Sequence, residues 1–387
     1  MRSRLKRLAA LIADGLLSAV GPALWPRIPT RALPSSPRVL LIRCDHIGDA
    51  AMATAVLPYL REVLEPEVID VLAGPWAAAL FASRAEVDRV MSYAAPWWSS
   101  ARGAGVIDRV RQWVRLPGVI RQIRAGRYDV GIDLRGDLRQ IVFFLGLGGI
   151  PIRAGTDRTG GRSVLTHAWP FDAARHDVDK NFAMIAMLAG ASEKAAVRVR
   201  RNPHDVRIPA EPPPMLRERL AQPSESLRYM VLAMRGSAPN RAWPATHAAI
   251  VADGVREMGF SVVLVGSAAD ASFAKEVGDA ARRSVIDLTG RTAISDLDAV
   301  FTGATATIAV DSGPMHLASA AGCPVIALFG PGDARTCGPW SDRTMVLRSD
   351  VPCVCRNPQC DFTSGPGRCM RSIEPEAVLT AVRQIVR

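Results

Sequence analysis

Short apolar runs alternate with helical patterns along this chain, and this alternation restricts its fold more than any other feature. The first run, residues 39–42, leads into CDHIGDA and a helical pattern, and further runs begin at Val68 and Tyr128. Parallel strands need a long crossover, usually a helix, so this order of elements indicates a parallel α/β sheet. The apolar stretch from Ile141 is too short to span a bilayer and is predicted to be a buried helix.

A proline-rich stretch interrupts the alternation near the middle of the chain. Residues 202–226 hold few apolar runs, and prolines of this density mark a domain boundary. We predict two Rossmann-like domains that face a central cleft: residues 35–205, a linker at 206–228, and residues 229–387. Strands of the second domain are expected at 229–234, 261–265, 285–287, 306–310 and 324–328. Ligands of such sheets bind at the carboxyl ends of the strands.

The charge balance predicts an anionic partner. The 387 residues carry 48 Lys and Arg against 37 Asp and Glu, a net charge of +11. Nucleic acid, an acidic membrane surface or a phosphorylated substrate would each suit this balance. The sequence has no basic block with interleaved aromatics and no helix-turn-helix or zinc-finger spacing, so no nucleic-acid partner is expected.

Residues 1–34 have the pattern of an amphipathic helix with a basic start. Within LAALIADGLLSAVGPALW, residues 8–25, apolar side chains share one helical face, while Asp14 and two glycines weaken it as a spanning helix. We predict a segment that associates with an anionic membrane surface. The alternatives are a cleaved signal peptide and a helix that packs on the domain.

Residues 307–331 read TIAVDSGPMHLASAAGCPVIALFGP and predict a strand, a helix and a second strand. Asp311 or Ser312 can cap the helix, Pro314 suits its first turn and Gly322 suits its end. The free N–H groups at a helix start carry partial positive charge and attract phosphate. The alternative is that DSGP is only a well-capped turn.

The same segment offers two more ligand contacts. Gly313 removes the side chain where the backbone of the loop would approach a ligand. His316 lies one turn further on and can face the same ligand.

Two further strand ends carry candidate functional residues. Asp49 follows the first strand at a helix start, and is either a cap or a general base. After residues 230–234, Gly236 and Ser237 offer N–H and hydroxyl donors, and Arg241 offers a guanidinium suited to a diphosphate. The alternative for Arg241 is a solvated loop charge. The first unit lacks GxGxxG, so a dinucleotide fingerprint is absent.

Together these segments resemble glycosyltransferase family 9, the ADP-heptose:lipopolysaccharide heptosyltransferases. The resemblance covers roughly residues 39–386 and is carried by VLLIRCDHIGDAAMATAVLPYLRE, YDVGIDLRGDLR, HDVDKNFAMIAMLAG, the GS…RAWP segment, LTGRTAISDL and VDSGPMHLASAAGCPVIALFGP. It implies a GT-B architecture, with an N-terminal acceptor domain, a C-terminal nucleotide-sugar domain and a last helix that crosses back.

The resemblance also implies roles for individual residues. Asp49 matches the proposed catalytic base. Arg241 stands where the family usually has a lysine, and Asp270 stands where it usually has a glutamate near the nucleoside. The remaining matches, on the phosphate side and on the donor-sugar loop, are Ser237, Asp311, Ser312, Gly313 and His316.

The implied reaction is an inverting transfer of heptose from ADP-heptose to a lipopolysaccharide core or other lipid-linked acceptor. The donor loop has no DxD pair, so we expect catalysis without a metal cofactor. The enzyme would be cytoplasmic and peripheral on the cytoplasmic face of the inner membrane. The alternatives are another nucleotide sugar, a protein acceptor, and a non-catalytic glycan- or nucleotide-binding module.

Two local clusters complete the sequence predictions. Residues 102–127 hold seven arginines against Asp108, and would face anionic lipid or acceptor phosphates, or form a solvated helix face. Four cysteines share one loop and suggest a structural zinc or iron, with free buried thiols or a disulfide as alternatives. They are Cys353, Cys355, Cys360 and Cys369.

Overall fold

The structure is a computed structural model that falls into two compact units, residues Met1–Arg201 and Asn202–Arg387. It describes residues 15, 19, 32–98, 105–190, 211–236, 239–351 and 367–386. Most of the amphipathic segment predicted over residues 1–34 therefore lies outside the described residues. Within the described residues, no helix is long and apolar enough to cross a membrane. We describe each unit by itself.

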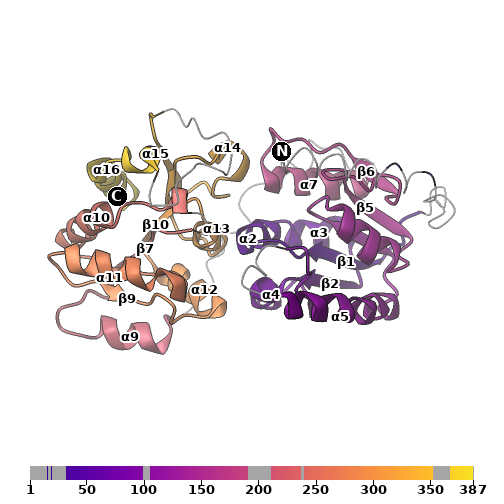
Figure 1. Cartoon of the computed structure of the whole chain (residues 1–387), viewed down its shortest axis with the longest axis horizontal. Helices are drawn as coiled ribbons and strands as arrows, with labels where there is room; N and C mark the ends of the chain where they lie inside the picture. Colours follow the sequence, from indigo (N-terminus) through magenta and orange to yellow (C-terminus); the bar gives the residue numbers. More distant parts are fainter. Residues whose placement is uncertain are drawn as a thin grey trace. The chain divides into compact units, whose positions relative to one another are not determined.

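Unit 1 is built on a six-stranded parallel sheet with the order β3-β2-β1-β4-β5-β6 (Figure 1). The central strand β1 pairs with β2 on one side and β4 on the other, so that Leu41 lies beside Val71 and Ile132. The strands are β1 (Arg38–Arg43), β2 (Val68–Ala73), β3 (Arg89–Ser92), β4 (Val130–Asp133), β5 (Ile152–Thr156) and β6 (His167–Trp169).

Helices cover both faces of this sheet. Leu40 and Ile42 of β1 belong to a core with side chains of α5 and of a π-helix, η2. On the α3 and α7 side, Tyr59 packs on Phe182 with ring centroids 5.3 Å apart. The helices are α2 (Ile47–Thr54), α3 (Leu57–Leu64), α4 (Pro75–Ala82), α5 (Val106–Ala125), α6 (Leu138–Gln140), η2 (Ile141–Gly146) and α7 (Asp177–Leu188). The buried helix predicted from Ile141 is confirmed, in π rather than α form.

Unit 2 repeats the topology of unit 1. Its parallel sheet has the order β12-β11-β10-β7-β8-β9, which is the order of unit 1 when the strands are counted from β7. The strands are β7 (Tyr229–Ala233), β8 (Ser261–Leu264), β9 (Ile286–Asp287), β10 (Ala306–Val310), β11 (Val325–Phe329) and β12 (Thr344–Arg348). Five of these were predicted within about a residue, and the four inner ones, β7, β8, β10 and β11, are continuous apolar runs or nearly so.

Helix α10 packs between two neighbours in unit 2, α11 and the last helix, α16 (Figure 1). One helix, α9, lies inside the stretch predicted as a linker, which is therefore not purely irregular. The helices are α9 (Pro214–Leu220), η3 (Pro239–Arg241), α10 (Ala245–Glu257), η4 (Ala268–Asp270), α11 (Ala271–Ala280), α12 (Ile294–Gly303), α13 (Gly313–Ala320), α14 (Ala334–Cys337), α15 (Arg368–Arg371) and α16 (Pro375–Ile385).

Candidate functional site

In unit 1, charged side chains gather where β1 and β4 end. Arg43 closes β1, Asp45 follows it, Asp49 lies in the first turn of α2, and Arg135 follows β4. The Arg43 guanidinium contacts Asp45 at 3.0 Å and Asp49 at 3.5 Å. Arg135 contacts the same two carboxylates at 2.9 Å and 3.3 Å. Two cations and two anions therefore alternate in one compact cluster.

Burial divides this cluster into an inner and an outer part. The side chains of Arg43 and Asp45 are 3% and 0% exposed, whereas those of Asp49 and Arg135 are 17% and 20% exposed. Arg135 also stacks over Trp98 at 4.8 Å from the ring centroid. Asp49 is therefore the carboxylate of this cluster that a ligand can reach.

The inner pair has shifted proton affinities. Burial raises the pKa of Asp45 to about 6, with Asp49 adding to the rise and both guanidinium groups opposing it. Burial lowers the pKa of Arg43, but the surrounding carboxylates, Asp45 foremost, raise it overall. Arg43 is also held by the carbonyl oxygens of Leu134 at 2.8 Å and Asp49 at 3.2 Å. These bonds tie the end of β1 to the start of α2 and to β4.

Asp133 fixes the turn that presents Arg135. Its fully buried carboxylate accepts hydrogen bonds from the backbone N–H groups of Arg135 at 3.1 Å and Asp137 at 2.9 Å. Burial raises the pKa of Asp133 to about 7, with Asp137 adding to the rise and the two backbone N–H groups opposing it.

The N-cap residue of α2 is His46, so Asp49 is not the N-cap that the alternative interpretation required.

In unit 2, the start of α13 is open. Ser312 is the N-cap residue, but its hydroxyl donates to the carbonyl oxygen of Val310 at 3.0 Å and makes no cap hydrogen bond. Of the two residues predicted as possible caps, Asp311 and Ser312, it is Ser312 that holds the N-cap position, although its side chain does not bond the helix. Pro314 lies in the first turn as predicted, and Gly322 has the left-handed φ of 70° typical of a helix end.

The strand ends around α13 approach closely because Gly236 has no side chain. A Cβ at this position would lie 3.2 Å from the Cβ of Ser312 and 3.4 Å from the carbonyl oxygen of Asp311. Gly236 thus lets the loop after β7 lie against the loop after β10. Gly313 and Pro314, at the helix start itself, are partly exposed.

Arg241 is held at this helix start by Asp311. Its Nη1 lies 3.2 Å from the Asp311 carboxylate and 3.5 Å from the Asp311 carbonyl oxygen. The Arg241 side chain is 39% exposed and that of Asp311 is 6% exposed, so the arginine is the member that a ligand can reach. The interpretation of Arg241 as a merely solvated loop charge is wrong.

The structure does not place two predicted ligand contacts, His316 and Ser237, on the described surface of this site. His316 is buried, at 6% exposure, which leaves little of its ring for a ligand in this conformation. Ser237 lies outside the described residues.

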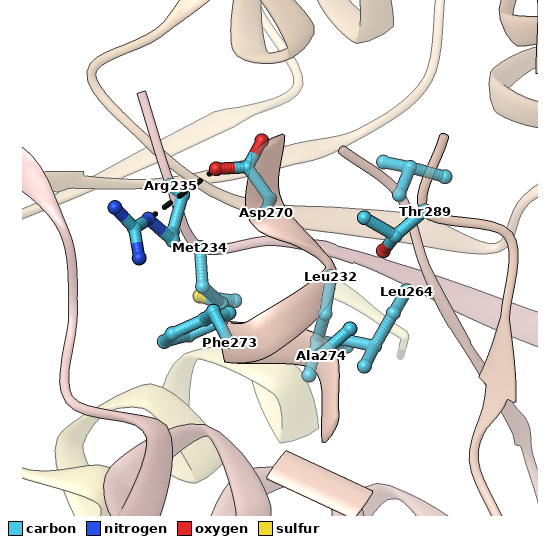
Figure 2. Close-up of a pocket in the computed structure, with 9 residues that line it drawn as sticks. Leu232, Met234, Arg235, Leu264, Asp270, Phe273, Ala274 and Thr289 are labelled. Atoms are coloured by element: carbon cyan, nitrogen blue, oxygen red, sulfur yellow. Dashed lines mark ion pairs between the residues drawn. The ribbon is translucent and has the colours of Figure 1, made fainter. Parts of the chain in front are cut away.

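A small pocket lies at the carboxyl ends of β7 and β8. Figure 2 shows the Arg235–Asp270 ion pair, whose atoms are 3.3 Å apart, beside a group of apolar side chains. The pocket is a shallow recess, part of it continuous with solvent, and is much smaller than a site that encloses a whole nucleotide. Its lining is Leu232, Met234, Arg235, Leu264, Val265, Asp270, Phe273, Ala274 and Thr289.

Asp270 has structural partners besides Arg235. One carboxylate oxygen accepts the Ser267 N–H at 2.9 Å and the Ser267 hydroxyl at 2.7 Å, which closes a capping box. These bonds fix the carboxylate at the pocket rim. A ligand hydroxyl would compete for lone pairs that Ser267 and Arg235 already use.

Three of the four clustered cysteines, Cys353, Cys355 and Cys360, lie outside the described residues. Cys369 is described and is buried. No group of three or more His, Cys, Asp and Glu side chains that could hold a metal ion occurs among the residues with described positions.

Two doubly wound units, one with an open helix start beside an arginine and the other with a reachable carboxylate, define the GT-B class of nucleotide-sugar glycosyltransferases. The model of glycosyltransferase family 9 (heptosyltransferase) matches residues 118–364. The chain therefore belongs to this family and is a glycosyltransferase.

Individual relatives agree with this assignment. The chain is 25% identical to lipooligosaccharide heptosyltransferase 2 of Haemophilus influenzae, over 90% of this chain and 99% of that protein. It shares its fold with E. coli ADP-heptose lps heptosyltransferase II, with a TM-score of 0.70, 21% identity and coverage of 90% and 98% of the two chains. E. coli heptosyltransferase WaaC with ADP-2-deoxy-2-fluoro heptose gives a TM-score of 0.66 at 18% identity, with coverage of 90% and 99%.

Sequence reasoning missed Arg43, Asp45, Arg135 and Arg235. Each follows or ends a predicted strand, so the rule that ligands bind at the carboxyl ends of strands was the available signal. The signal was weak because Arg43 and Arg135 are 92 positions apart, and their contact with shared carboxylates depends on the pairing of β1 with β4.

Proposed function

We propose that this glycosyltransferase transfers a heptose from ADP-heptose to a lipopolysaccharide core acceptor, by an inverting displacement with Asp49 as the base. The names of its relatives support the sugar and the acceptor class, since they include lipooligosaccharide and ADP-heptose lps heptosyltransferases. The likeness to E. coli heptosyltransferase WaaC with ADP-2-deoxy-2-fluoro heptose supports the nucleotide of the donor.

The observation that carries the proposal is the open start of α13. The hydroxyl of Ser312 is turned away to Val310, so the N-cap side chain makes no cap hydrogen bond to this helix. Partial positive charge at the helix start and the Arg241 guanidinium suit a diphosphate. Asp311 keeps Arg241 in place for this task. Ser237 would add a hydroxyl donor.

The adenosine end of the donor would lie at the pocket beside β7 and β8. Phe273 and Leu264 supply apolar surface for a ring, and Asp270 and Arg235 supply polar groups at the rim. This arrangement of apolar lining with a few fixed polar groups is usual for nucleotide sites. Gly313 and His316 would line the sugar side of the same donor.

In the displacement, an acceptor hydroxyl oxygen attacks the anomeric carbon of the heptose, and the bond from that carbon to the phosphate oxygen breaks. The bonding electrons leave with ADP, whose charge is stabilised by the α13 start and Arg241. The hydroxyl proton passes to the Asp49 carboxylate. The donor and the base must act on one acceptor molecule, so both units take part in the proposed reaction.

Arg43 and Arg135 would orient the base. Each contacts a different oxygen of Asp49, at 3.5 Å and 3.3 Å. A carboxylate held by two guanidinium groups has few orientations available, which favours a productive angle toward the acceptor. Asp45 offsets the charge of both arginines from inside the protein.

The acceptor class also suggests where the enzyme acts. We propose peripheral association with the anionic cytoplasmic face of the inner membrane, supported by the net charge of +11 and the amphipathic pattern of residues 1–34. The four clustered cysteines remain a proposed structural zinc or iron site, in which Cys369 is the described member. Elemental analysis of the purified protein tests that site, and an absence of both metals would remove it.

The decisive experiment incubates the full chain with ADP-heptose and a heptose-deficient lipopolysaccharide acceptor, and follows product by mass spectrometry and NMR. The proposal predicts a transferred heptose of inverted anomeric configuration. A retained configuration would exclude the single displacement. Thermal-shift measurements with a panel of nucleotide diphosphate sugars separate the alternatives, because a larger shift with another sugar would overturn ADP-heptose as the donor.

A further inference from the structure

Helix α5 of unit 1 exposes an unusual number of large apolar side chains. It is 20 residues long, and Leu116 and Ile123 are its buried side chains, facing the core. Its first half carries half of the ten large apolar side chains that are exposed in the described residues. They are Val106 (68% exposed), Ile107 (70%), Val110 (54%), Trp113 (48%) and Val114 (74%).

These five side chains form one stripe that points away from unit 1. At 3.6 residues per turn they fall within an arc of about 120°, on the side of the helix opposite to Leu116 and Ile123. Trp113 lies at the edge of the stripe, and its ring packs on Trp97 and Phe143 with centroids 5.5 Å and 6.0 Å away. The stripe thus has a rigid aromatic base.

Arginines frame and extend the apolar stripe. On the helical wheel Arg109 and Arg111 lie on its two flanks, while Arg121 and Arg124 continue its line in the second half of the helix. Residues 105–127 hold six arginines against one aspartate, a net charge of +5, and all six arginines are exposed. The arginines of this segment are therefore not simply a solvated charged face, because an apolar ridge runs between them.

We propose that the exposed face of α5, defined by the five apolar residues and by Arg109, Arg111, Arg121 and Arg124, lies flat on the surface of an anionic phospholipid membrane. This inference rests on the proposed function, whose acceptor is lipid-linked, and names the surface that brings the enzyme to it. A helix with an apolar stripe, a tryptophan and flanking basic residues has the pattern of helices that lie in the membrane interface. The arginines would contact headgroup phosphates while the apolar side chains enter the acyl boundary.

Charge complementarity selects this occupant over a second copy of the chain. A symmetric dimer through α5 would place two faces with four arginines each against each other, and like charges across an interface oppose association. An anionic bilayer supplies the opposite charge over an extended flat area. Of the other exposed apolar residues, Leu227 and Ile250 lie far apart in the sequence and share no helix with arginines at this density.

The first test measures co-sedimentation of the full chain with vesicles of phosphatidylglycerol mixed with phosphatidylcholine, and with vesicles of phosphatidylcholine alone. Val110→Asp combined with Val114→Asp should weaken binding to the anionic vesicles by roughly tenfold or more. Two aliphatic side chains that would enter the membrane are replaced by negative charges that the headgroups repel. Leu227→Asp is the matched control, because Leu227 is 79% exposed and lies in unit 2. Equal binding by the double variant and the control would overturn the proposal.

A second measurement does not depend on those variants. Brominated phosphatidylglycerol vesicles should quench the fluorescence of Trp113, and the quenched fraction should fall in Trp113→Phe, which keeps an aromatic ring against Trp97. No difference in quenching between the two proteins would show that α5 stays out of the bilayer. Quenching that persists on pure phosphatidylcholine would contradict the role assigned to the arginines.

The outcomes separate this inference from the proposed function. Transfer of heptose to detergent-dispersed acceptor, measured for the unaltered chain, tests the function alone. If the unaltered chain transfers heptose and the double variant binds vesicles as well as the unaltered chain does, the proposed function stands and the membrane role of α5 is refuted. Sedimentation velocity tests the alternative of a dimer. A concentration-dependent dimer that is lost in the double variant would show that the α5 face binds a second copy of the chain, and would overturn the proposal of membrane binding.

Discussion

The two units have the same strand order but use the carboxyl ends of their sheets differently. In unit 1 the ends of β1 and β4 bury Arg43 and Asp45 under a reachable carboxylate, Asp49. In unit 2 the end of β10 leads to an open helix start beside the half-exposed Arg241. The shared topology puts a site at the carboxyl ends of the strands in each unit. The side chains at those strand ends decide whether the site holds a proton acceptor or binds an anion.

Buried carboxylates occur in both sites. In unit 1 burial removes water from Asp45 and Asp133 and raises the pKa of both groups above the ordinary value. In unit 2 the buried carboxylate of Asp311 lies 3.2 Å from the Arg241 guanidinium. This ion pair holds Arg241 in position. The predictions below test this contrast in order of decreasing expected effect.

The largest effect concerns the stability of unit 1 against pH. The pKa of Asp133 is about 7 in the native state against 3.8 for the ordinary group, so the native state holds a proton that the unfolded state has released. The contribution of Asp133 to the free energy of unfolding should therefore be fully present below about pH 4 and be lost as the pH rises through about 7, by up to about 4 kcal/mol. Asp45 adds to the same fall, over a window that ends near pH 6.

This effect is measured by urea unfolding of Asp133→Asn and of the unaltered chain between about pH 4 and about pH 8, which covers the window of the fall. The Asn variant should lose most of the fall with pH. Asp88→Asn, at a carboxylate that is 44% exposed in the same unit, should keep the full slope. Parallel slopes for all three proteins would show that Asp133 ionises normally.

The second effect concerns catalysis in unit 1. Asp49→Asn should lower turnover by about 10²-fold, or about 2.7 kcal/mol in activation free energy, because an amide does not take the acceptor proton. Donor affinity, measured by calorimetry with ADP-heptose, should stay unchanged, since the donor contacts proposed here lie in unit 2. Glu376→Gln is the matched control, because Glu376 is also a first-turn carboxylate paired with an arginine, at 2.8 Å. Turnover of Asp49→Asn within a factor of about two of the control would refute the base assignment.

The third and smallest effect concerns the anion site of unit 2. Arg241→Ala should weaken the binding of ADP-heptose and of ADP by about tenfold, near 1.4 kcal/mol, the size of one charge-assisted hydrogen bond. Arg383→Ala, at a side chain of similar exposure (48% against 39%), should bind both ligands normally. An unaltered donor affinity in Arg241→Ala would remove this residue from the site.

Much of the fold could be predicted from the sequence because central strands are buried on both faces. Residues 306–310 were predicted as a strand and form β10, and the helix after it ends at Gly322 with the expected left-handed backbone. Strands β3, β5, β6 and β12 were not predicted. The edge strands β3, β6 and β12 have exposed or partly exposed side chains that give no continuous apolar run, and Arg153 interrupts the run of β5. The helix within the proposed linker, α9, was hidden by the prolines that precede it.

The candidate site could be predicted only in part. Asp49, Arg241 and the DSGP turn were found because each follows a predicted strand and opens a helix or loop. Ser312 is the N-cap residue, one of the two predicted candidates, but its side chain does not cap, since a hydroxyl next to a helix start can equally bond the strand before it. The partners of these residues, Arg135 and Asp45 above all, were not found.

The sequence by itself determined the alternation of strands and helices, the family and the positions at which functional side chains had to occur. Those signals are local, because periodicity and helix termini depend on neighbours within a few residues. Only the tertiary structure decided that Arg43 and Arg135 share two carboxylates and that Asp311 holds Arg241. The contacts of Arg135 with Asp45 and of Arg241 with Asp311 join residues 90 and 70 positions apart along the chain. They exist because parallel strands bring distant carboxyl ends to one edge of a sheet.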